Sequence, residues 1–327
     1  MAKDKYKIRI SNRLDSFLNV DMKTFNFYKP NDKVNKNKFY SMVINGMYEY
    51  YLNDNNIIFN TLCDEAPNDK NFNKNLADSI NKNLLKTHHS DLSDFLHPVD
   101  IYIQTTKENQ DTFNKIEANS LKNETFSEFV RNLLIKYISL PMYLREMIIF
   151  KDNYHLLKYS FKESIEILVT TNDNEQYLFR QFGACLNGDE TNYYFIGEIV
   201  IDNLTELKSF KLSDIKHITL TDNYYLFTKE KLEYISSKII HGPELIDNNE
   251  DNIVLQFDDT GVDMYFKNEH GRPLYIDCNE DTNIFTFQFN ENKMFNYLKI
   301  FGKHVKVITP LSLKNKLKDF YKSAINE

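Results

Sequence analysis

A short alternating strand followed by two amphipathic helices opens the chain and constrains how it can fold. Polar and apolar side chains alternate there, so Ile8 and Ile10 share one face while Lys7 and Arg9 share the other. Helical spacing of apolar residues follows on both sides of a break at Pro30. Because an isolated two-stranded ribbon is only marginally stable, this strand needs both a partner strand and helices packed beneath it.

The same order of elements returns later in the chain, after an intervening helical stretch. Residues 100–104 alternate again, and a helical pattern follows them. Thr125 and Glu128 then form a capping-box signature at the start of another helix. Apolar residues recur at helical spacing as far as Ile138, which predicts a strongly amphipathic helix that ends before Pro141.

Each of these units resembles the ribbon-helix-helix fold, in which one short strand pairs antiparallel with its copy. Two units in one chain could therefore form an intramolecular pseudo-dimer. The alternative is that the two strands are unrelated parts of a helical domain. The sequence leaves both readings open, and it also leaves open whether pairing occurs within one chain or between two chains.

An aromatic strand, an acidic turn and a second strand with basic residues follow one another between Thr191 and Leu220. Tyr193, Tyr194 and Phe195 form the aromatic element. The second element contains Lys208, Phe210, Lys211 and Leu212, and Asp214 comes after it. This order resembles the core of the WYL domain, an Sm-like β-barrel. In that family an Arg-x-Phe-Arg-Leu-type strand follows a Trp-Tyr-Leu tripeptide; here Lys replaces Arg, Trp is absent, and Asp214 stands where another Arg is usual.

The segments after residue 250 resemble, in order, the C-terminal extension found behind many WYL domains, a small α/β module that often mediates dimerisation. The polar stretch 245–252 reads as a linker before it. We therefore expect an α+β multidomain protein. Its parts are a ribbon-helix-helix-like nucleic-acid-binding region at 1–150, a WYL barrel at 160–240 and the α/β module at 250–327.

Composition narrows the class of protein. The 327 residues carry a net charge of −7, which argues against a uniformly basic coat but not against a local basic patch. The three cysteines, Cys63, Cys185 and Cys278, are far apart and favour a reducing cytosol. No apolar run is long enough for a membrane helix, and the N-terminus lacks the apolar core of a signal peptide. We expect a cytoplasmic protein.

The amino-terminal region departs from the overall charge. Residues 1–50 contain ten basic and five acidic side chains, a net charge of +5. Lys5, Lys7, Arg9 and Arg13 are the candidate phosphate contacts. The outward positions of the second strand, which include Tyr102, are not basic, so the pattern favours single-strand backbone contact with base stacking over symmetric duplex reading. The alternative is a solvated edge that discourages sheet aggregation.

The WYL-like segment supplies a second candidate surface, in which cations meet phosphates and rings meet bases. Its residues are Arg180, Tyr193, Tyr194, Lys208, Phe210 and Lys211. Core packing is the alternative for Tyr194 and is favoured for Phe210. Because Lys208 and Lys211 are three residues apart, a regular strand places them on opposite faces, with Lys208 beside Phe210 and Lys211 outward.

The sequence contains no enzyme, cofactor or metal signature. The cluster of His88, His89, Asp91, Asp94 and His97 lacks metal-ligand spacing and reads as a solvated turn. Asp258–Asp263 lacks the ligand ladder of an EF-hand loop, and Gly183–Gly188 is followed by Asp189 and Glu190, which replace the Lys-Ser/Thr of a P-loop. We therefore expect a non-enzymatic protein without cofactor or bound metal.

A ribbon-helix-helix front end on a WYL domain resembles the accessory proteins of compact RNA-targeting (type VI-D) CRISPR systems. The resemblance implies single-stranded RNA (or DNA) binding, an RNA-guided nuclease as partner, and a homodimer. The alternative function is a ligand-sensing WYL transcription regulator that binds duplex DNA. A hydrolase or nuclease with diverged motifs is a third, less favoured class.

Overall fold

The computed structural model divides the chain into two compact units, Met1–Tyr154 and His155–Glu327. It describes residues 5–29, 31–65, 69–87, 98–120, 125–187, 191–201, 204–239, 242–243, 252–268, 272–289 and 291–325. The described elements form a mixed α/β fold with antiparallel sheets. No helix in these ranges combines the length and apolar character needed to cross a membrane.

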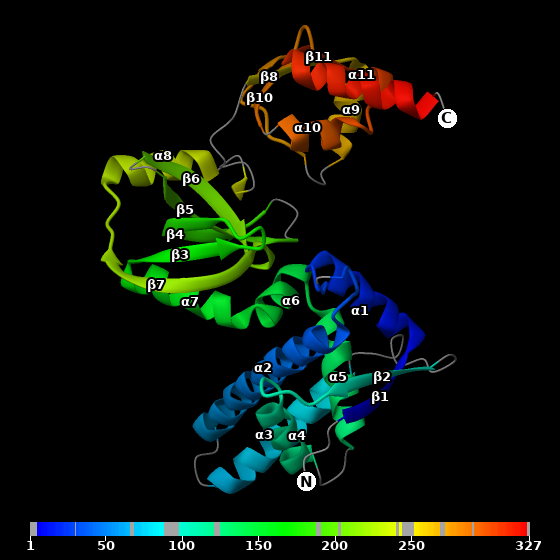
Figure 1. Ribbon diagram of the computed structural model, residues 1–327, viewed down its shortest axis with the longest axis vertical. Coiled ribbons are helices and arrows are strands. Elements are labelled where there is room, and N and C mark those ends of the chain that lie inside the picture. Colours follow the sequence, from blue (N-terminus) through cyan, green and yellow to red (C-terminus); the bar gives the residue numbers. More distant parts are fainter. Residues whose placement is uncertain are drawn as a thin grey trace. The chain divides into compact units, whose positions relative to one another are not determined.

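The first unit pairs its two short strands within one chain (Figure 1). Its elements are β1 (Lys5–Ser11), α1 (Asn12–Thr24), α2 (Lys36–Glu65), α3 (Lys70–Thr87), β2 (Pro98–Gln104), α4 (Gln110–Ser120), α5 (Phe126–Ser139) and α6 (Met142–Ile149). Strands β1 and β2 run antiparallel, with Ile8 opposite Ile101 and Arg9 opposite Asp100. The question that the sequence left open is therefore answered for this unit: the two strands are partners in a two-stranded ribbon.

The inner face of this ribbon packs on the helices, as the alternation predicts. Ile8 and Ile10 of β1 are buried, as are Ile101 and Ile103 of β2. The ring of Tyr6 stacks on Phe126 of α5 with a centroid distance of 4.2 Å. Apolar burial beneath the ribbon supplies the support that two strands alone lack.

Side-chain caps begin helices α1 and α5, the second of them at the capping box that the sequence indicates. Ser11 accepts a hydrogen bond from the backbone N–H of Leu14 at the start of α1. The Thr125 hydroxyl likewise accepts from the backbone N–H of Glu128 at the start of α5, at 3.2 Å. Both interactions satisfy donors that a helix leaves unpaired at its N-terminus.

A buried ion pair links α1, α5 and α6. Arg145 Nη1 lies 2.6 Å from both carboxylate oxygens of Asp21, and the Tyr137 hydroxyl donates to the same carboxylate at 2.7 Å. Burial raises the pKa of Asp21, and the opposing effects of Arg145 and Tyr137 favour its charged form. Gly46 lets helices α2 and α6 pack closely together. A β-carbon at this position would collide with the Ile148 carbonyl and separate the two helices.

A five-stranded antiparallel sheet forms the first part of the second unit. Its elements are α7 (Lys151–Glu163, which crosses the boundary between the units), β3 (Ile165–Thr171), β4 (Gln176–Leu186), β5 (Tyr193–Ile201), β6 (Leu204–Lys211), η1 (Leu212–Asp214), β7 (Ile215–Tyr224) and α8 (Lys229–Ile239). The strand order is β6-β5-β4-β3-β7. No strand ladder joins β6 to β7 in the described residues. The described sheet is therefore not closed into the Sm-like barrel that the resemblance implies.

The carboxy-terminal module has its own four-stranded sheet and apolar core. Its elements are β8 (Asn252–Phe257), α9 (Asp259–Lys267), β9 (Asp277–Asn279), β10 (Ile284–Gln288), α10 (Glu291–Leu298), η3 (Gly302–His304), β11 (Val305–Thr309) and α11 (Leu311–Ile325). The order β11-β8-β10-β9 makes β8 and β10 interior strands. Neither β8 nor β10 therefore has an uncovered edge, and β9 and β11 are the edge strands of the described sheet. Apart from Asn252, the linker expected at 245–252 lies outside the described residues.

Candidate nucleic-acid interface

The outer face of the ribbon gathers cations from β1 and polar groups from β2. Lys5, Lys7 and Arg9 are exposed along β1. Asp100, Tyr102 and Gln104 occupy the outward positions of β2. Because the register places Lys7 opposite Tyr102, the two strands present one continuous surface. Three cations against one carboxylate give this face a charge of +2.

The single carboxylate contacts two of the three cations. Lys7 Nζ lies 2.8 Å from Asp100 Oδ2, and Arg9 Nε lies 3.2 Å from Asp100 Oδ1. Lys7 and then Arg9 lower the pKa of Asp100, and Asp100 in turn raises the pKa of Lys7. The sequence predicts the basic face correctly, but this partial internal neutralisation depends on the register of the two strands.

Lys5 is placed differently, over an aromatic ring. Its Nζ lies 4.3 Å from the centroid of Tyr102, and that ring is half exposed. A cation beside an exposed ring is the combination that suits a phosphate next to a stacked base. The predicted pairing of basic and aromatic side chains is therefore present at this end of the ribbon.

Two arginines extend the basic character beyond the strands. The Arg13 guanidinium on α1 lies 6.0 Å from the centroid of the exposed Phe17 ring. Arg131 on α5 donates from Nε to the Arg9 carbonyl at 2.8 Å. Sequence reasoning missed Arg131, since only the folded packing of α5 against β1 brings it to the ribbon.

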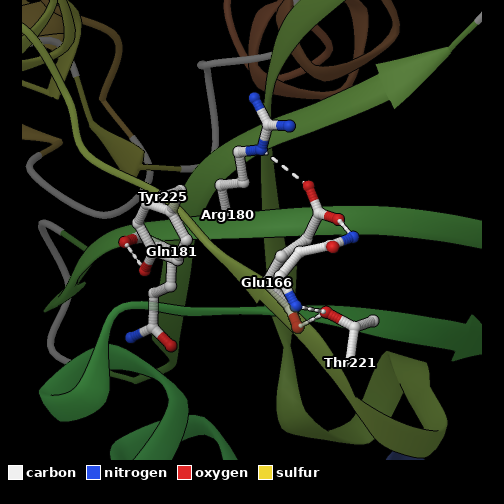
Figure 2. A network of polar contacts seen from close by, with 6 residues as sticks. Glu166, Arg180, Gln181, Thr221 and Tyr225 are labelled. Carbon is white, nitrogen blue, oxygen red and sulfur yellow. Dashed lines mark hydrogen bonds and ion pairs between the residues drawn. The ribbon is translucent and has the colours of Figure 1, made fainter.

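A row of charged residues crosses the middle of the five-stranded sheet, and Figure 2 shows two of them, Glu166 and Arg180. Glu166 of β3 is buried, and its Oε2 lies 2.7 Å from Nε of Arg180 on β4. Asn223 donates to Glu166 Oε1 at 3.0 Å, and the Thr221 hydroxyl donates to the Glu166 carbonyl at 2.5 Å. Figure 2 shows the far end of the Arg180 guanidinium directed away from Glu166.

The row continues onto β5 and α8. Arg180 is paired across the ladder with Glu198, which is buried and forms an ion pair with Lys231 of α8. Carboxylate and cation therefore alternate from Glu166 through Arg180 and Glu198 to Lys231. This arrangement commits Arg180 to holding a buried carboxylate, a function that the sequence did not indicate.

The structure divides the predicted WYL-like residues between the two faces of the sheet. Arg180, Tyr194 and Lys211 share one face, while Tyr193, Lys208 and Phe210 share the other. A single groove on one face of this sheet therefore does not contain all of them.

The aromatic contacts of the two lysines follow this division. Lys208 Nζ lies 4.8 Å from the Tyr177 ring and 5.8 Å from the Phe210 ring. Lys211 Nζ lies 5.6 Å from the Tyr194 ring. Phe210 is buried, as the packing interpretation favoured, whereas Lys211 is half-buried instead of fully outward.

Two segments that the sequence analysis weighed as metal sites are the Asp258 segment and the histidine cluster. Asp258 is the N-cap of α9, where its side chain accepts from the Gly261 N–H at 2.8 Å and contacts His304. The histidine cluster at 88–97 lies outside the described residues. No group of three or more potential metal ligands occurs in the ranges that the structure describes.

An apolar cavity of about 260 Å³ lies between α2, α3 and α5. Asp54 and Lys136 are the charged residues of its lining. Ile57 and Leu84 also line it, and their side chains are partly exposed to solvent. Burial raises the pKa of Asp54, and the nearby Lys136 opposes that shift. Asp54 and Lys136 together contribute no net charge to this lining.

Comparisons with known proteins concern the fold. No protein-family profile and no curated protein sequence matches the chain. A solved structure described as a CRISPR Cas-related protein aligns over 100% of this chain and 94% of that chain, with a TM-score of 0.75 and 15% identity. Proteasome accessory factor B/C of Arthrobacter aurescens aligns over 67% of this chain and 35% of its own, with a TM-score of 0.30 and 8% identity. The first comparison establishes a shared fold, and the second carries no further argument.

Proposed function

We propose that this protein is a non-enzymatic, single-stranded RNA-binding accessory protein of an RNA-targeting CRISPR system. The observation that carries the proposal is the shared fold, over the whole chain, with a protein described as CRISPR Cas-related. The ribbon adds a chemical reason, because Lys5, Lys7 and Arg9 form a cationic face beside the half-exposed ring of Tyr102. In this role the RNA-bound protein would modulate an RNA-guided nuclease.

The finer assignment is also part of the proposal. In it, the first unit is a pseudo-dimeric ribbon-helix-helix domain, supported by the β1–β2 ladder within one chain. The five-stranded sheet with its η1 turn is the WYL domain with an Sm-like topology, and the carboxy-terminal module is the WYL extension. Self-association would use this module, in which β9 and β11 are the edge strands of the described sheet.

Competition between polymers tests the proposal. Fluorescence anisotropy of a labelled oligouridine is measured with the full-length protein, and unlabelled single-stranded RNA, single-stranded DNA and duplex DNA are added as competitors. We expect single-stranded RNA to compete best. Stronger competition by duplex DNA would replace the proposal with the transcription-regulator alternative, and absence of binding to any polymer would reject both.

A separate observation supports the ligand-sensing alternative. The two terminal nitrogens of Arg180 have no hydrogen-bond partner among the described residues, while Nε is fixed by the buried Glu166. A guanidinium held in this way suits a planar anionic group. Titration with a mononucleotide, followed by the change in thermal unfolding temperature, distinguishes the two functions: stabilisation lost in Arg180→Lys favours ligand sensing.

A further inference from the structure

The carboxy-terminal module contains a second concentration of positive charge. Residues 299–325 include seven lysines and one aspartate, a net charge of +6 in a chain whose net charge is −7. This exceeds the +5 of residues 1–50. The ribbon cations do not account for it, because these lysines belong to η3, β11, α11 and, in the case of Lys299, the turn after α10.

Three of these lysines form an unpaired stripe along α11. Lys314, Lys318 and Lys322 are exposed and follow one another at intervals of four residues, so they lie on one side of the helix. Among the described residues, none of the three makes an ion pair or a side-chain hydrogen bond. By contrast, Lys316 on another side of α11 pairs with Glu291 at 2.7 Å.

A fourth lysine lies near this side of the helix. Tyr321 is three residues after Lys318 and shares its side of α11. The Tyr321 hydroxyl accepts from the Gly302 N–H at 3.1 Å, which fixes the η3 turn close to α11. The exposed Lys303 is the next residue in that turn.

The spacing and setting of the stripe favour a phosphodiester backbone as its partner. Successive lysines are about 6 Å apart along the helix axis, comparable with neighbouring phosphates of an extended strand. Like charges four residues apart destabilise a helix unless an anion compensates them. A membrane-surface helix would need a free apolar face, but Leu313 and Leu317 of α11 are buried in the core of the module.

We propose that the α11 stripe, Lys314, Lys318 and Lys322, is a second contact surface for single-stranded nucleic acid. This inference rests on the proposed RNA-binding function and adds a surface on the other structural unit. Lysines that act as mobile point charges would contact the backbone without reading the base sequence. The protein would therefore bind a longer strand more tightly than the ribbon alone permits.

The test compares three variants of the full-length protein with the parent by oligouridine anisotropy at several salt concentrations. The first carries Lys314→Gln, Lys318→Gln and Lys322→Gln. The second carries Lys5→Gln, Lys7→Gln and Arg9→Gln. The third, a matched control, carries Lys115→Gln, Lys229→Gln and Lys267→Gln, three exposed lysines that each pair with an acid four residues away.

We expect the slope of log affinity against log salt to become shallower by about 2 in the α11 variant, since each single-strand contact contributes about 0.7. The charge-matched control should keep the parent slope. If the ribbon variant loses slope while the α11 variant does not, this inference is wrong and the proposed function stands. If the parent does not bind oligouridine, both fail.

Two further measurements distinguish other partners. Loss of binding to phosphatidylserine vesicles in the α11 variant, with unchanged oligouridine binding, would assign the stripe to a lipid surface. A change of molar mass in light scattering, again with unchanged oligouridine binding, would assign it to contact with a second copy. Either result would overturn the nucleic-acid proposal.

Discussion

The β1–β2 ribbon and the five-stranded sheet both contain arginine or lysine beside a carboxylate, but the two settings differ. On the ribbon, Lys7 and Arg9 are exposed and share Asp100, whose side chain is 29% exposed. In the sheet, Arg180 contacts Glu166, whose side chain is only 3% exposed. Water screens the ion pairs of Asp100 but is excluded from the Glu166 carboxylate. The two interactions therefore contribute differently to the free energy of unfolding.

This difference separates the residues proposed to bind RNA from residues that hold the fold. An exposed ion pair contributes little to stability, so its cations can exchange one anion for another. A buried carboxylate that loses its cation is strongly destabilising, because its charge is left uncompensated. We therefore expect ribbon substitutions to change RNA affinity and substitutions in the sheet row to change stability.

The largest expected effect is on the stability of the sheet. Glu166→Ala removes both the acceptor of Arg180 Nε and the acceptor of Asn223. We expect the free energy of unfolding to fall by about 3 kcal/mol, the lower end of the range for broken buried pairs, because Arg180 is partly exposed. Urea unfolding followed by tyrosine fluorescence measures it.

The matched control for this substitution is Glu206→Ala on β6. Glu206 is exposed, and its loss should change the free energy of unfolding by less than about 0.5 kcal/mol. Equal, small losses in both variants would show that water screens the Glu166–Arg180 pair as well. The sheet row would then contribute no more to stability than the exposed ion pairs of the ribbon.

The next effect is on binding by the ribbon. Replacing Lys5, Lys7 and Arg9 with Gln should leave the fold intact, since all three side chains are exposed. The slope of log affinity against log salt should become shallower by about 2 if each makes one single-strand contact. An unchanged slope in the oligouridine titration would assign these cations to solvation of the strand edge.

Elements with regular apolar spacing could be predicted from the sequence, and those with a close backbone approach could not. Strand β1 and helix α5 follow their expected periods, with buried residues at the expected positions. Strand β7 lacks this regular signal, because its buried residues Ile215 and Ile218 are three apart and its pairing with β3 contains two register shifts. Alternation of period two is absent there.

Helix α9 lacks a local sequence signal for a different reason. Gly261 and its acidic neighbours have low helix propensity, yet Asp258 caps the helix and Gly261 is buried within it. A β-carbon at Gly261 would collide with the His304 carbonyl, so glycine is required by packing between segments far apart in sequence. Such a requirement has no local signal.

The candidate site shows the same limit. The basic face of β1 was readable from alternation, because it depends on neighbouring residues alone. Its neutralisation by Asp100 requires the β1–β2 register, and the role of Arg180 requires the packing of Glu166 beside it. Sequence therefore indicated which residues carry charge but not which charges are already paired.

Asp100→Asn sharpens the account of the ribbon, with a smaller expected effect. In the proposed function Asp100 competes with RNA phosphates for Lys7 and Arg9, so its removal should raise affinity about threefold, the size expected for an exposed ion pair. Asp111→Asn is the control, since it removes the same charge from a carboxylate paired with Lys115 on α4. Equal gains in both variants would mean that net charge, and not release of the ribbon cations, is responsible.

The pKa of Asp100 offers an independent check. Lys7 and then Arg9 lower this pKa below its ordinary value of 3.8. A lowered pKa means that the pairing is present above pH 3.8 and is lost as the pH falls through the lower value, so the competition persists at neutral pH. When RNA takes the two cations, an NMR titration should show the pKa of Asp100 moving upward towards 3.8. A pKa that does not move would place the RNA elsewhere.

The smallest effects concern Lys208 and Lys211, which lie on opposite faces of the sheet. Lys208→Glu removes a cation 4.8 Å from the Tyr177 ring and should cost up to about 1 kcal/mol of stability. Lys211→Glu removes a cation 5.6 Å from the Tyr194 ring and should lower stability by about half as much.

If the face with Lys211 and Arg180 also contacts RNA, Lys211→Glu should reduce the salt slope by about 0.7, and Lys208→Glu should leave it unchanged. Melting temperature and oligouridine affinity, measured for both variants, separate the two roles. If Lys211→Glu binds like the parent, the sheet holds its charges for stability alone, and RNA contact belongs to the exposed cations outside it.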